Sequence, residues 1–275
     1  GRVFRPDRNA IGRLVHRAVG KNKATVFLKT DGGEVGFRLT TQGNLHIDRD
    51  SLPKPEPSIF IPSREVLAMY EGFVKAYEER ELSFDETYRD LCVALSGTPL
   101  RGPRLTAVKK LAEPLEKILN GRVALDGGRF YLAAVAGNLE AHLLSEGLRK
   151  IGSLLHLIVN GSLMKNGFLF WDEPEANLNP QLVTKIVETL RHLALFGVQV
   201  FVASHDYLLT QHLALPPAKG ERGAPMRFFC FNRDEAAGIR IDQGDTIARL
   251  ASNPILDEFA RYYDRQRDSF NQAAE

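Results

Sequence analysis

Two adjacent carboxylates, Asp172 and Glu173, end an apolar run in the segment FLFWDEPEANLNP, residues 168–180. In a parallel sheet, ligands bind beyond the carboxyl ends of the strands, so acids that leave such a strand face a ligand site. One acid can hold Mg²⁺, directly or through water, and the next can orient a water for attack on a phosphate. The alternative is structural: one acid caps the following turn and the other is solvated.

A histidine ends the next predicted strand, VQVFVAS, in the sequence Ser204-His205-Asp206. Two neighbouring parallel strands would thus deliver Asp172, Glu173 and His205 to one edge of the sheet. There the imidazole can hydrogen-bond a γ-phosphate or position the attacking water. A single histidine at a strand end is commonly structural, and only its combination with the two acids favours the chemical interpretation.

A third group of residues, SEGLRK at 145–150, stands at the start of a predicted amphipathic helix. Ser145 would offer a hydroxyl there, and Gly147 would leave the backbone N–H groups open to an anion. The alternative is that Ser145 is an ordinary N-cap.

The elements that must position these residues alternate in the second half of the chain. Apolar residues at helical spacing predict a helix over 146–160, and further helices are expected over 180–196 and after His205. FLFW, VQVFVAS and MRFFCFN predict strands, so this half should form a parallel sheet with crossover helices. FLFW is uniformly apolar, as expected for a strand that is buried on both faces.

The first half of the chain predicts smaller units. Residues 24–49 predict β-structure with a hairpin turn at the Asp31-Gly32-Gly33 tract. The connector LPKPEP leads to a short buried strand, SIFIP, and then to a helix expected over 64–80. Residues 83–120 should be helical apart from a loop near GTPLRGPR, and the following segment should return to strands with a turn at Gly127-Gly128.

Composition limits the number of domains and the class of protein. The 275 residues are 44% hydrophobic and 25% charged with a net charge of +2, which is typical of one large or two small globular domains. Cys92 and Cys230 are too few and too far apart for a disulfide framework or a zinc site, which favours a cytoplasmic location. No apolar run approaches the roughly 18 residues of a membrane span, and the N-terminus is no signal peptide.

The order and spacing of SEGLRK, FLFWDEPEANLNP and VFVASHD resemble the C-terminal lobe of ABC-type ATPases, above all the SMC-like prokaryotic AAA-family group. Four other segments are similar to segments of the same group: VFRPD, FIPSREVL, ELSFDETYRDLC and LRGPRL. The resemblance implies an α/β, P-loop NTPase-like fold with a parallel core sheet. Its expected parts are an antiparallel β-subdomain (1–57), a helical insertion with connecting strands (58–142), and the signature, Walker B and switch lobe (143–275).

The resemblance also implies roles for particular residues and two cofactors, ATP and Mg²⁺. SEG would be the signature, FLFWDE Walker B, NLNP the D-loop and His205 the switch histidine. Glu173 and His205 would be catalytic, and Asp172 would hold the metal. The nucleotide contacts would be Ser145, Gly147, Asn177 and Asn179. Arg64, after the SIFIP strand, is a further candidate near the nucleotide, with a surface salt bridge as its alternative.

Relatives of this kind pair head to tail, so the resemblance implies a homodimer or a higher even-numbered oligomer with ATP at the interface. It also implies a partner effector such as a nuclease, and a role in antiviral defence like that of Septu-like and retron-associated ATPases. One departure is large: the sequence contains no G-x-x-x-x-G-K-[ST], and VGKNKATV lacks the glycine spacing. ATPase activity is therefore expected only together with a Walker A segment outside these residues.

The sequence is also compatible with two other functions. The chain could be a non-hydrolysing scaffold that uses the dimer geometry to hold or inhibit an effector. A nuclease function is weakly supported, because no further acidic cluster resembles a TOPRIM or HNH site. Residues 1–50 carry ten Lys/Arg against five Asp/Glu, which fits either a nucleic-acid surface or a solvated face. The clustered basic residues are Arg2, Arg5, Arg8, Arg13, Arg17, Lys21 and Lys23.

Overall fold

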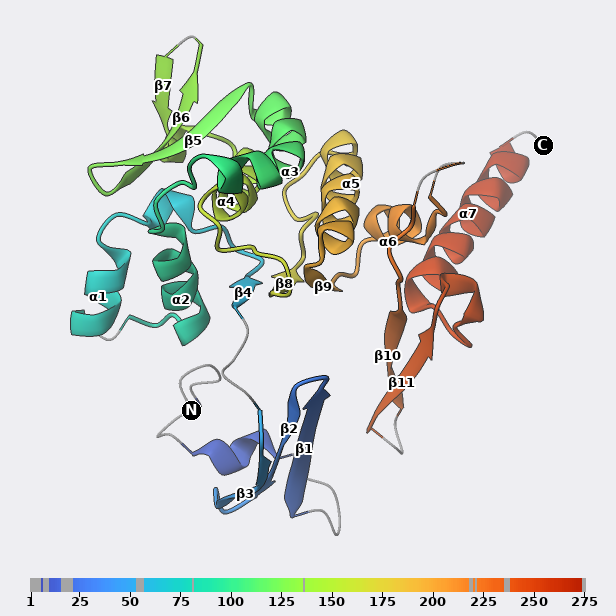
Figure 1. Cartoon of the computed structure of the whole chain (residues 1–275). Helices are drawn as coiled ribbons and strands as arrows, with labels where there is room; N and C mark the ends of the chain where they lie inside the picture. Colours follow the sequence, from blue (N-terminus) through green and yellow to red (C-terminus); the bar gives the residue numbers. More distant parts are fainter. Residues whose placement is uncertain are drawn as a thin grey trace.

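The computed structural model describes residues 6, 10–15, 22–52, 57–80, 82–135, 137–217, 220, 222–234 and 238–273. Its elements surround a small parallel sheet, with helices above that sheet and an antiparallel sheet below it in Figure 1. Among the clustered basic residues, Arg13 and Lys23 fall in described segments. Those that lie outside the described residues are Arg2, Arg5, Arg8, Arg17 and Lys21.

The central sheet is parallel and has the strand order β4-β8-β9. Leu169 pairs with Ile59 on one side and with Val200 on the other. The three strands are β4 (Ser58–Ile61), β8 (Phe168–Asp172) and β9 (Gln199–Ala203). They confirm the strands predicted at SIFIP, FLFW and VQVFVAS, and they give the fold the parallel α/β core that was expected. The sheet draws β4 from residues 58–142 and its other strands from residues 143–275.

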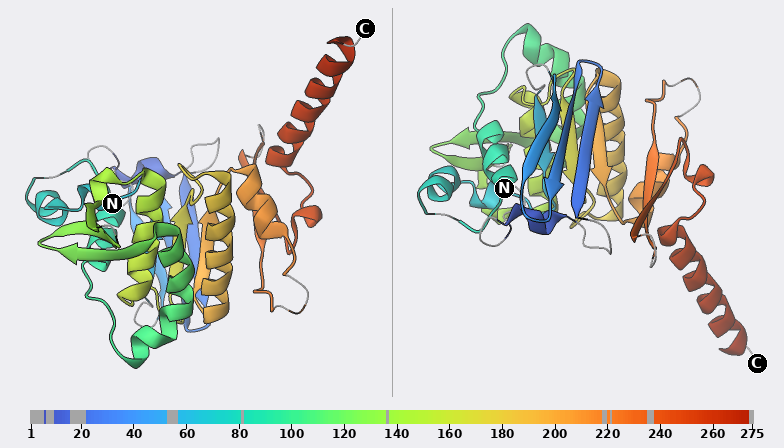
Figure 2. Two further views of the ribbon diagram at one scale, coloured as in Figure 1. Left: turned by 90° about the horizontal axis from the view of Figure 1, so that it is seen from above. Right: turned by 90° about the horizontal axis from the view of Figure 1, so that it is seen from below.

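Helices cover the upper face of this sheet (Figure 2). Leu154 of α4 and Ile186 of α5 belong to the same buried core as Trp171 of β8. These two helices are α4 (Glu146–Val159) and α5 (Pro180–Phe196), while α3 (Pro103–Leu119) packs against α4 and α2 (Glu86–Leu95) lies beside β4. The helices predicted over 146–160 and 180–196 are therefore confirmed, and so is the loop that separates α2 from α3.

The lower face of the sheet is open, so the prediction that FLFW is buried on both faces is wrong. Phe60, Phe170 and Phe201 point away from the helices and are 38%, 37% and 42% exposed. An apolar run requires only that the residues on both faces be hydrophobic, whereas burial of a face depends on a layer that covers it.

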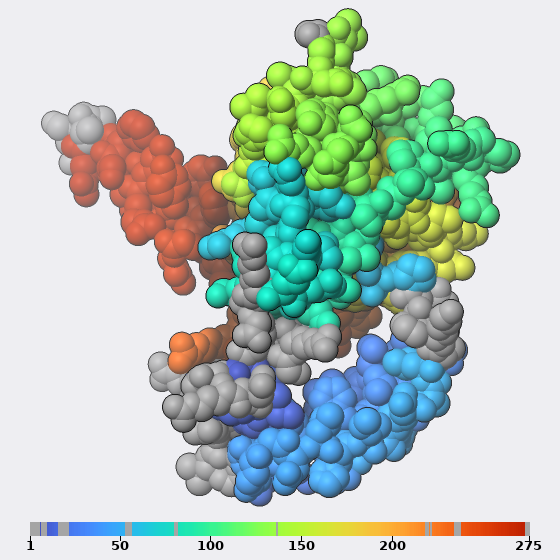
Figure 3. All heavy atoms as spheres, turned by 90° about the vertical axis from the view of Figure 1, so that its left-hand side faces the viewer, coloured from blue at the N-terminus to red at the C-terminus, as the bar shows by residue number. Residues whose placement is uncertain are grey.

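Two antiparallel sheets follow the predicted hairpins. In the first, β1 (Lys23–Thr30), β2 (Gly33–Thr40) and β3 (Leu45–Asp50) pair in sequence order. In Figure 3 the blue atoms of this sheet form a lobe beneath the cyan and green helical body. The second sheet joins β5 (Gly121–Asp126), β6 (Arg129–Ala134) and β7 (Gly137–Glu140), with its first turn at Gly127-Gly128 as predicted.

The helix predicted over 64–80 begins later, at α1 (Phe73–Arg80). A 3₁₀ turn at Leu67–Met69 comes first, and Gly72 then adopts a left-handed φ of 68°. A continuous α-helix cannot pass through a left-handed residue. As a result Ser63 and Arg64 remain in the segment that leaves the end of β4.

The C-terminal part contains α6 (Tyr207–Ala214), β10 (Phe228–Asp234), β11 (Gly238–Gly244) and α7 (Pro254–Ala273). MRFFCFN was expected in the parallel sheet, but β10 pairs with β11 in an antiparallel two-stranded sheet. A strand's composition does not specify its partner, so its sequence alone could not show this. Helix α7 projects from the body in both views of Figure 2. Among the described residues, no helix combines the length and apolarity needed to cross a membrane.

Candidate functional site

The ends of β8 and β9 bring two of the predicted residues into contact. Asp172 pairs with Ala203 in the last step of the ladder, and the Glu173 N–H continues it by donating to the Ala203 carbonyl at 2.8 Å. Glu173 Oε1 then lies 3.0 Å from His205 Nδ1. The His205 side chain is 81% exposed, so its other ring nitrogen is open to a ligand. Asp172 is half-buried at the same sheet edge.

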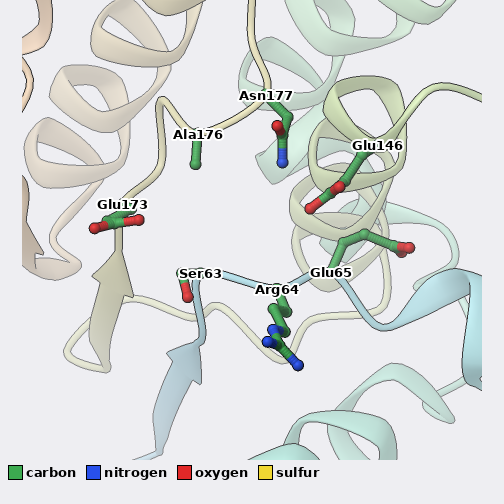
Figure 4. A pocket seen from close by; sticks show the side chains of 7 residues that line it. All are labelled: Ser63, Arg64, Glu65, Glu146, Glu173, Ala176 and Asn177. Atoms are coloured by element: carbon green, nitrogen blue, oxygen red, sulfur yellow. The ribbon is translucent and has the colours of Figure 1, made fainter.

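A cavity of about 480 Å³ opens beside these strand ends. In Figure 4, Ser63 and Glu173 border it from the ends of β4 and β8, while Asn177 points into it from the loop after β8. Glu146 faces the same space from the first turn of α4. The complete lining is Ser63, Arg64, Glu65, Glu146, Glu173, Ala176 and Asn177. Three chain segments that are far apart in sequence therefore meet at one hollow.

The start of α4 forms one wall of this hollow. Ser145 is the N-cap, and its Oγ accepts a hydrogen bond from the Leu148 N–H at 3.4 Å. A Cβ added to Gly147 would lie 2.6 Å from the Asn177 carbonyl oxygen and 2.8 Å from Leu178 Cδ2. The glycine is therefore required for α4 to pack against the loop of its own chain. This packing requires a glycine whether or not a ligand is bound.

Asn177 and Asn179, the two asparagines predicted to contact the nucleotide, occupy different positions. Asn177 lines the cavity and adopts a left-handed φ of 65°, which asparagine tolerates better than most residues. Asn179 caps α5, because its Oδ1 accepts a hydrogen bond from the Leu182 N–H at 3.0 Å. Pro180 follows at the first helical position, where no backbone N–H is needed. Asn179 and Ser145 are not among the residues that line the cavity.

Arg64 is one of the lining residues, as expected for a residue that follows the SIFIP strand. Its neighbour Glu65 accepts a 2.6 Å hydrogen bond from Arg149 Nε, and both side chains of this ion pair are largely buried. The pair connects the segment after β4 to the first turns of α4. Arg64 is the basic residue in the cavity lining.

The cavity edge carries more acids than bases. Glu146 and Glu173 line it with Arg64, and Asp172 ends the strand beside them. Carboxylates repel a polyphosphate unless a cation lies between them. Mg²⁺ binds through one or two carboxylates and fills its other positions with water and phosphate oxygens. Asp172 fits that role, although no cluster of three or more His, Cys, Asp or Glu within the described residues is arranged to enclose a metal.

Sequence reasoning missed two buried charged residues beside the site. Lys150 of α4 is 1% exposed, and its Nζ donates to the carbonyl oxygens of Glu173 and Ala176. Glu175 is buried too, and its Oε1 accepts a 2.6 Å hydrogen bond from Ser204 Oγ. Burial raises the pKa of Glu175. Lys150 left a signal in the sequence, since it interrupts the apolar stripe of an amphipathic helix.

Comparison with known proteins gives one family and several similar folds. Residues 38–210 match the family described as "AAA domain, putative AbiEii toxin, Type IV TA system". An SMC head bound to the C-winged helix domain of ScpA has 10% identity and a TM-score of 0.46, over 81% of this chain and 73% of that chain. The SMC head domain from Thermotoga maritima has 12% identity and a TM-score of 0.39, over 69% and 66%. For cbiO1 from Clostridium perfringens, part of the ABC transporter complex cbiONQ, the values are 14% and 0.31, over 64% and 61%. No curated protein sequence matches the chain.

Proposed function

The chain belongs to this AAA-domain family, and from that premise we propose that it binds and hydrolyses ATP as part of an ABC-type ATPase. One observation carries the proposal: the Glu173 carboxylate contacts His205 at 3.0 Å where two parallel strands end beside a cavity. Both side chains are bases that can accept or orient a proton. Their pairing at a strand end suits activation of a water for attack on a phosphate.

Each residue has a distinct task in this proposal. Asp172 holds Mg²⁺, which when bound neutralises phosphate charge and so offsets the acidic edge. Glu173 orients the attacking water, and His205 keeps that carboxylate in place while its exposed ring contacts the γ-phosphate.

The nucleotide held by a second subunit is contacted by four residues of this chain: Ser145, Gly147, Asn177 and Asn179. The caps and close packing of these four residues give that surface a fixed shape.

The active unit in this proposal is a head-to-tail homodimer, or a higher even-numbered oligomer, with ATP at the subunit interface. Nucleotide state is coupled to an effector, such as a nuclease of an antiviral defence system, or to nucleic acid. Binding of the nucleotide phosphates requires a Walker A segment in the active protein. Residues 1–275 contain no G-x-x-x-x-G-K-[ST].

The test is Glu173→Gln in the complete gene product. Glutamine keeps the size of the side chain and one hydrogen-bonding oxygen but removes the charge that polarises water. Turnover should fall about 10²- to 10⁴-fold, while the Kd for ATP stays within a few fold. ATP hydrolysis and fluorescent-nucleotide binding measure the two quantities. The matched control is Glu188→Gln, which removes an exposed acid of α5 that pairs with Lys185.

Two results would count against the proposal in different ways. If the wild-type protein hydrolyses no ATP although it binds ATP and forms dimers, the chain is the non-hydrolysing scaffold. If Glu173→Gln hydrolyses ATP at the wild-type rate, the carboxylate pair is structural, and the residues that activate water must lie elsewhere.

A further inference from the structure

Lys150 is a charged residue on the buried face of α4, and only 1% of its surface is exposed. Its Nζ donates hydrogen bonds to the carbonyl oxygen of Glu173 at 3.2 Å and to that of Ala176 at 3.1 Å. Burial lowers the pKa of this ammonium group, because the surroundings disfavour its charge. A buried ammonium is unfavourable unless it is hydrogen-bonded, so these two carbonyl groups explain its presence.

Both carbonyl groups belong to the turn that directs the Glu173 side chain. The Ala176 N–H donates to the Glu173 carbonyl at 3.1 Å, and the Leu178 N–H donates to the Glu175 carbonyl at 3.0 Å. Glu173 itself has a φ of 47°, in the left-handed region that residues other than glycine seldom adopt. Such a conformation persists only where its surroundings hold it. Lys150 contacts the turn at its first residue and again three residues later.

A second contact holds the turn from the side of β9. Glu175 Oε1 accepts a 2.6 Å hydrogen bond from Ser204 Oγ, which in turn accepts one from the Asp206 N–H at 3.0 Å. Ser204 directly precedes His205, the residue that contacts Glu173. The backbone of the turn is thus fixed by α4 on one side and by the loop after β9 on the other. The carboxylate and the imidazole meet between these two attachments.

We infer that Lys150 is a positioning residue for ATP hydrolysis: by holding the carbonyl groups of the turn at 173–176, it aims the Glu173 carboxylate at His205 and the cavity. The inference rests on the proposed function, since it assigns Lys150 a part in the same reaction. Lys150 touches neither nucleotide nor water in this scheme. It acts through the backbone, and a displacement of about 1 Å in a reacting group can reduce the rate about 10²-fold.

The experiment is Lys150→Met in the complete gene product, with Lys185→Met as the matched control. Methionine fills a similar volume but donates no hydrogen bond, and it removes a charge whose burial is unfavourable. The loss of the two hydrogen bonds to the turn opposes this gain, so the Tm should change little, while kcat falls about 10²-fold and KM for ATP changes less than about twofold. Lys185 is an exposed lysine of α5 that pairs with Glu188, so its replacement should change neither kcat nor Tm. If kcat of the folded variant remains at the wild-type value, Lys150 is not a positioning residue, and a kcat that falls only together with the Tm assigns Lys150 a structural role.

A second measurement separates this inference from the proposed ATPase activity. Hydrogen exchange of the Ala176 and Leu178 amides reports on the turn whether or not ATP is hydrolysed. In Lys150→Met these amides should exchange about tenfold faster, and in Lys150→Gln, which keeps an N–H donor, the increase should be smaller. A wild-type protein without ATPase activity refutes the proposed function, and unchanged amide exchange in both Lys150 variants refutes the inference.

Discussion

The two faces of the β4-β8-β9 sheet come from the same apolar strands but have different surroundings. On the upper face, under the helices, Ile61, Leu169 and Trp171 are at most 2% exposed. On the lower face the exposed fraction is 38% for Phe60 and 42% for Phe201. The difference shows that hydrophobic composition determines which faces can be buried, while the neighbouring layer determines which face is buried.

The open face is not disordered, since its aromatic rings cover one another. Phe170 and Phe201 stack with ring centroids 4.7 Å apart and planes 9° from parallel. The N-terminal sheet below carries exposed apolar residues as well: Val26, Leu28, Leu45 and Ile47. The closed face therefore gains its stability from burial against helices, and the open face from contacts between its own side chains.

The sharpest test of this comparison uses two neighbouring residues of β8. Leu169→Ala removes a fully buried side chain and should lower the free energy of unfolding by about 2–5 kcal/mol. Phe170→Ala removes a larger side chain from the open face but should cost only about 1–2 kcal/mol. Urea denaturation of both variants measures the difference. Equal losses, or a greater loss at Phe170, would mean that the lower face is covered in solution.

The helices on the upper face of the sheet also bury an ionisable group, His156 of α4. Its Nε2 lies 3.0 Å from the Leu95 carbonyl oxygen. Burial lowers the pKa of His156, so the folded protein resists the proton that the unfolded chain takes up below about pH 6.5. The contribution to stability is therefore complete above that pH. It is lost as the pH falls toward the folded-state pKa, by up to about 1.4 kcal/mol per unit.

His156→Gln should reduce the loss of stability that occurs as the pH falls, because glutamine does not titrate. The measurement is the free energy of unfolding between about pH 7.5 and 5. His192→Gln replaces an exposed histidine of α5 and should leave the slope at its wild-type value. An unchanged slope in His156→Gln would assign the acid sensitivity to other groups.

The smallest expected effect is on the surface of the open face. Phe201→Thr keeps a residue that favours β-structure and removes one ring of the exposed stack. Binding of the apolar dye ANS should fall modestly, because the dye reports exposed hydrophobic surface. Leu139→Thr, at an exposed position on β7, serves as the control and should leave dye binding unchanged. Undiminished fluorescence in Phe201→Thr would show that the dye binds elsewhere.

Periodicity along the chain predicted most of the elements that position the site. The amphipathic pattern of 146–160 and the apolar runs at β8 and β9 placed α4 and both strand ends within a residue or two. Knowing that two parallel strands end at one edge was enough to expect Glu173 beside His205. The N-cap that was the alternative interpretation of Ser145 is present, whereas the cap at Asn179 was not predicted.

The features that were missed depend on contacts between distant residues. The pairing of β10 with β11 reflects the choice of a partner, which strand composition does not encode. The burial of Glu175 requires Ser204, 29 residues away, and that of Lys150 requires a turn 23 residues away. A charged residue in an apolar stripe indicates that a partner exists, but only the folded structure identifies it.

Gly147 has a consequence for the genetics of this protein. Every other amino acid carries the Cβ that would collide with the Asn177 carbonyl oxygen, so a saturation library at codon 147 should be depleted before any ligand is present. Screens for folding and screens for activity would return the same survivors at that codon. A loss-of-function allele there would not identify the defect, whereas alleles at His205, whose side chain is 81% exposed, can separate a folding defect from a catalytic one.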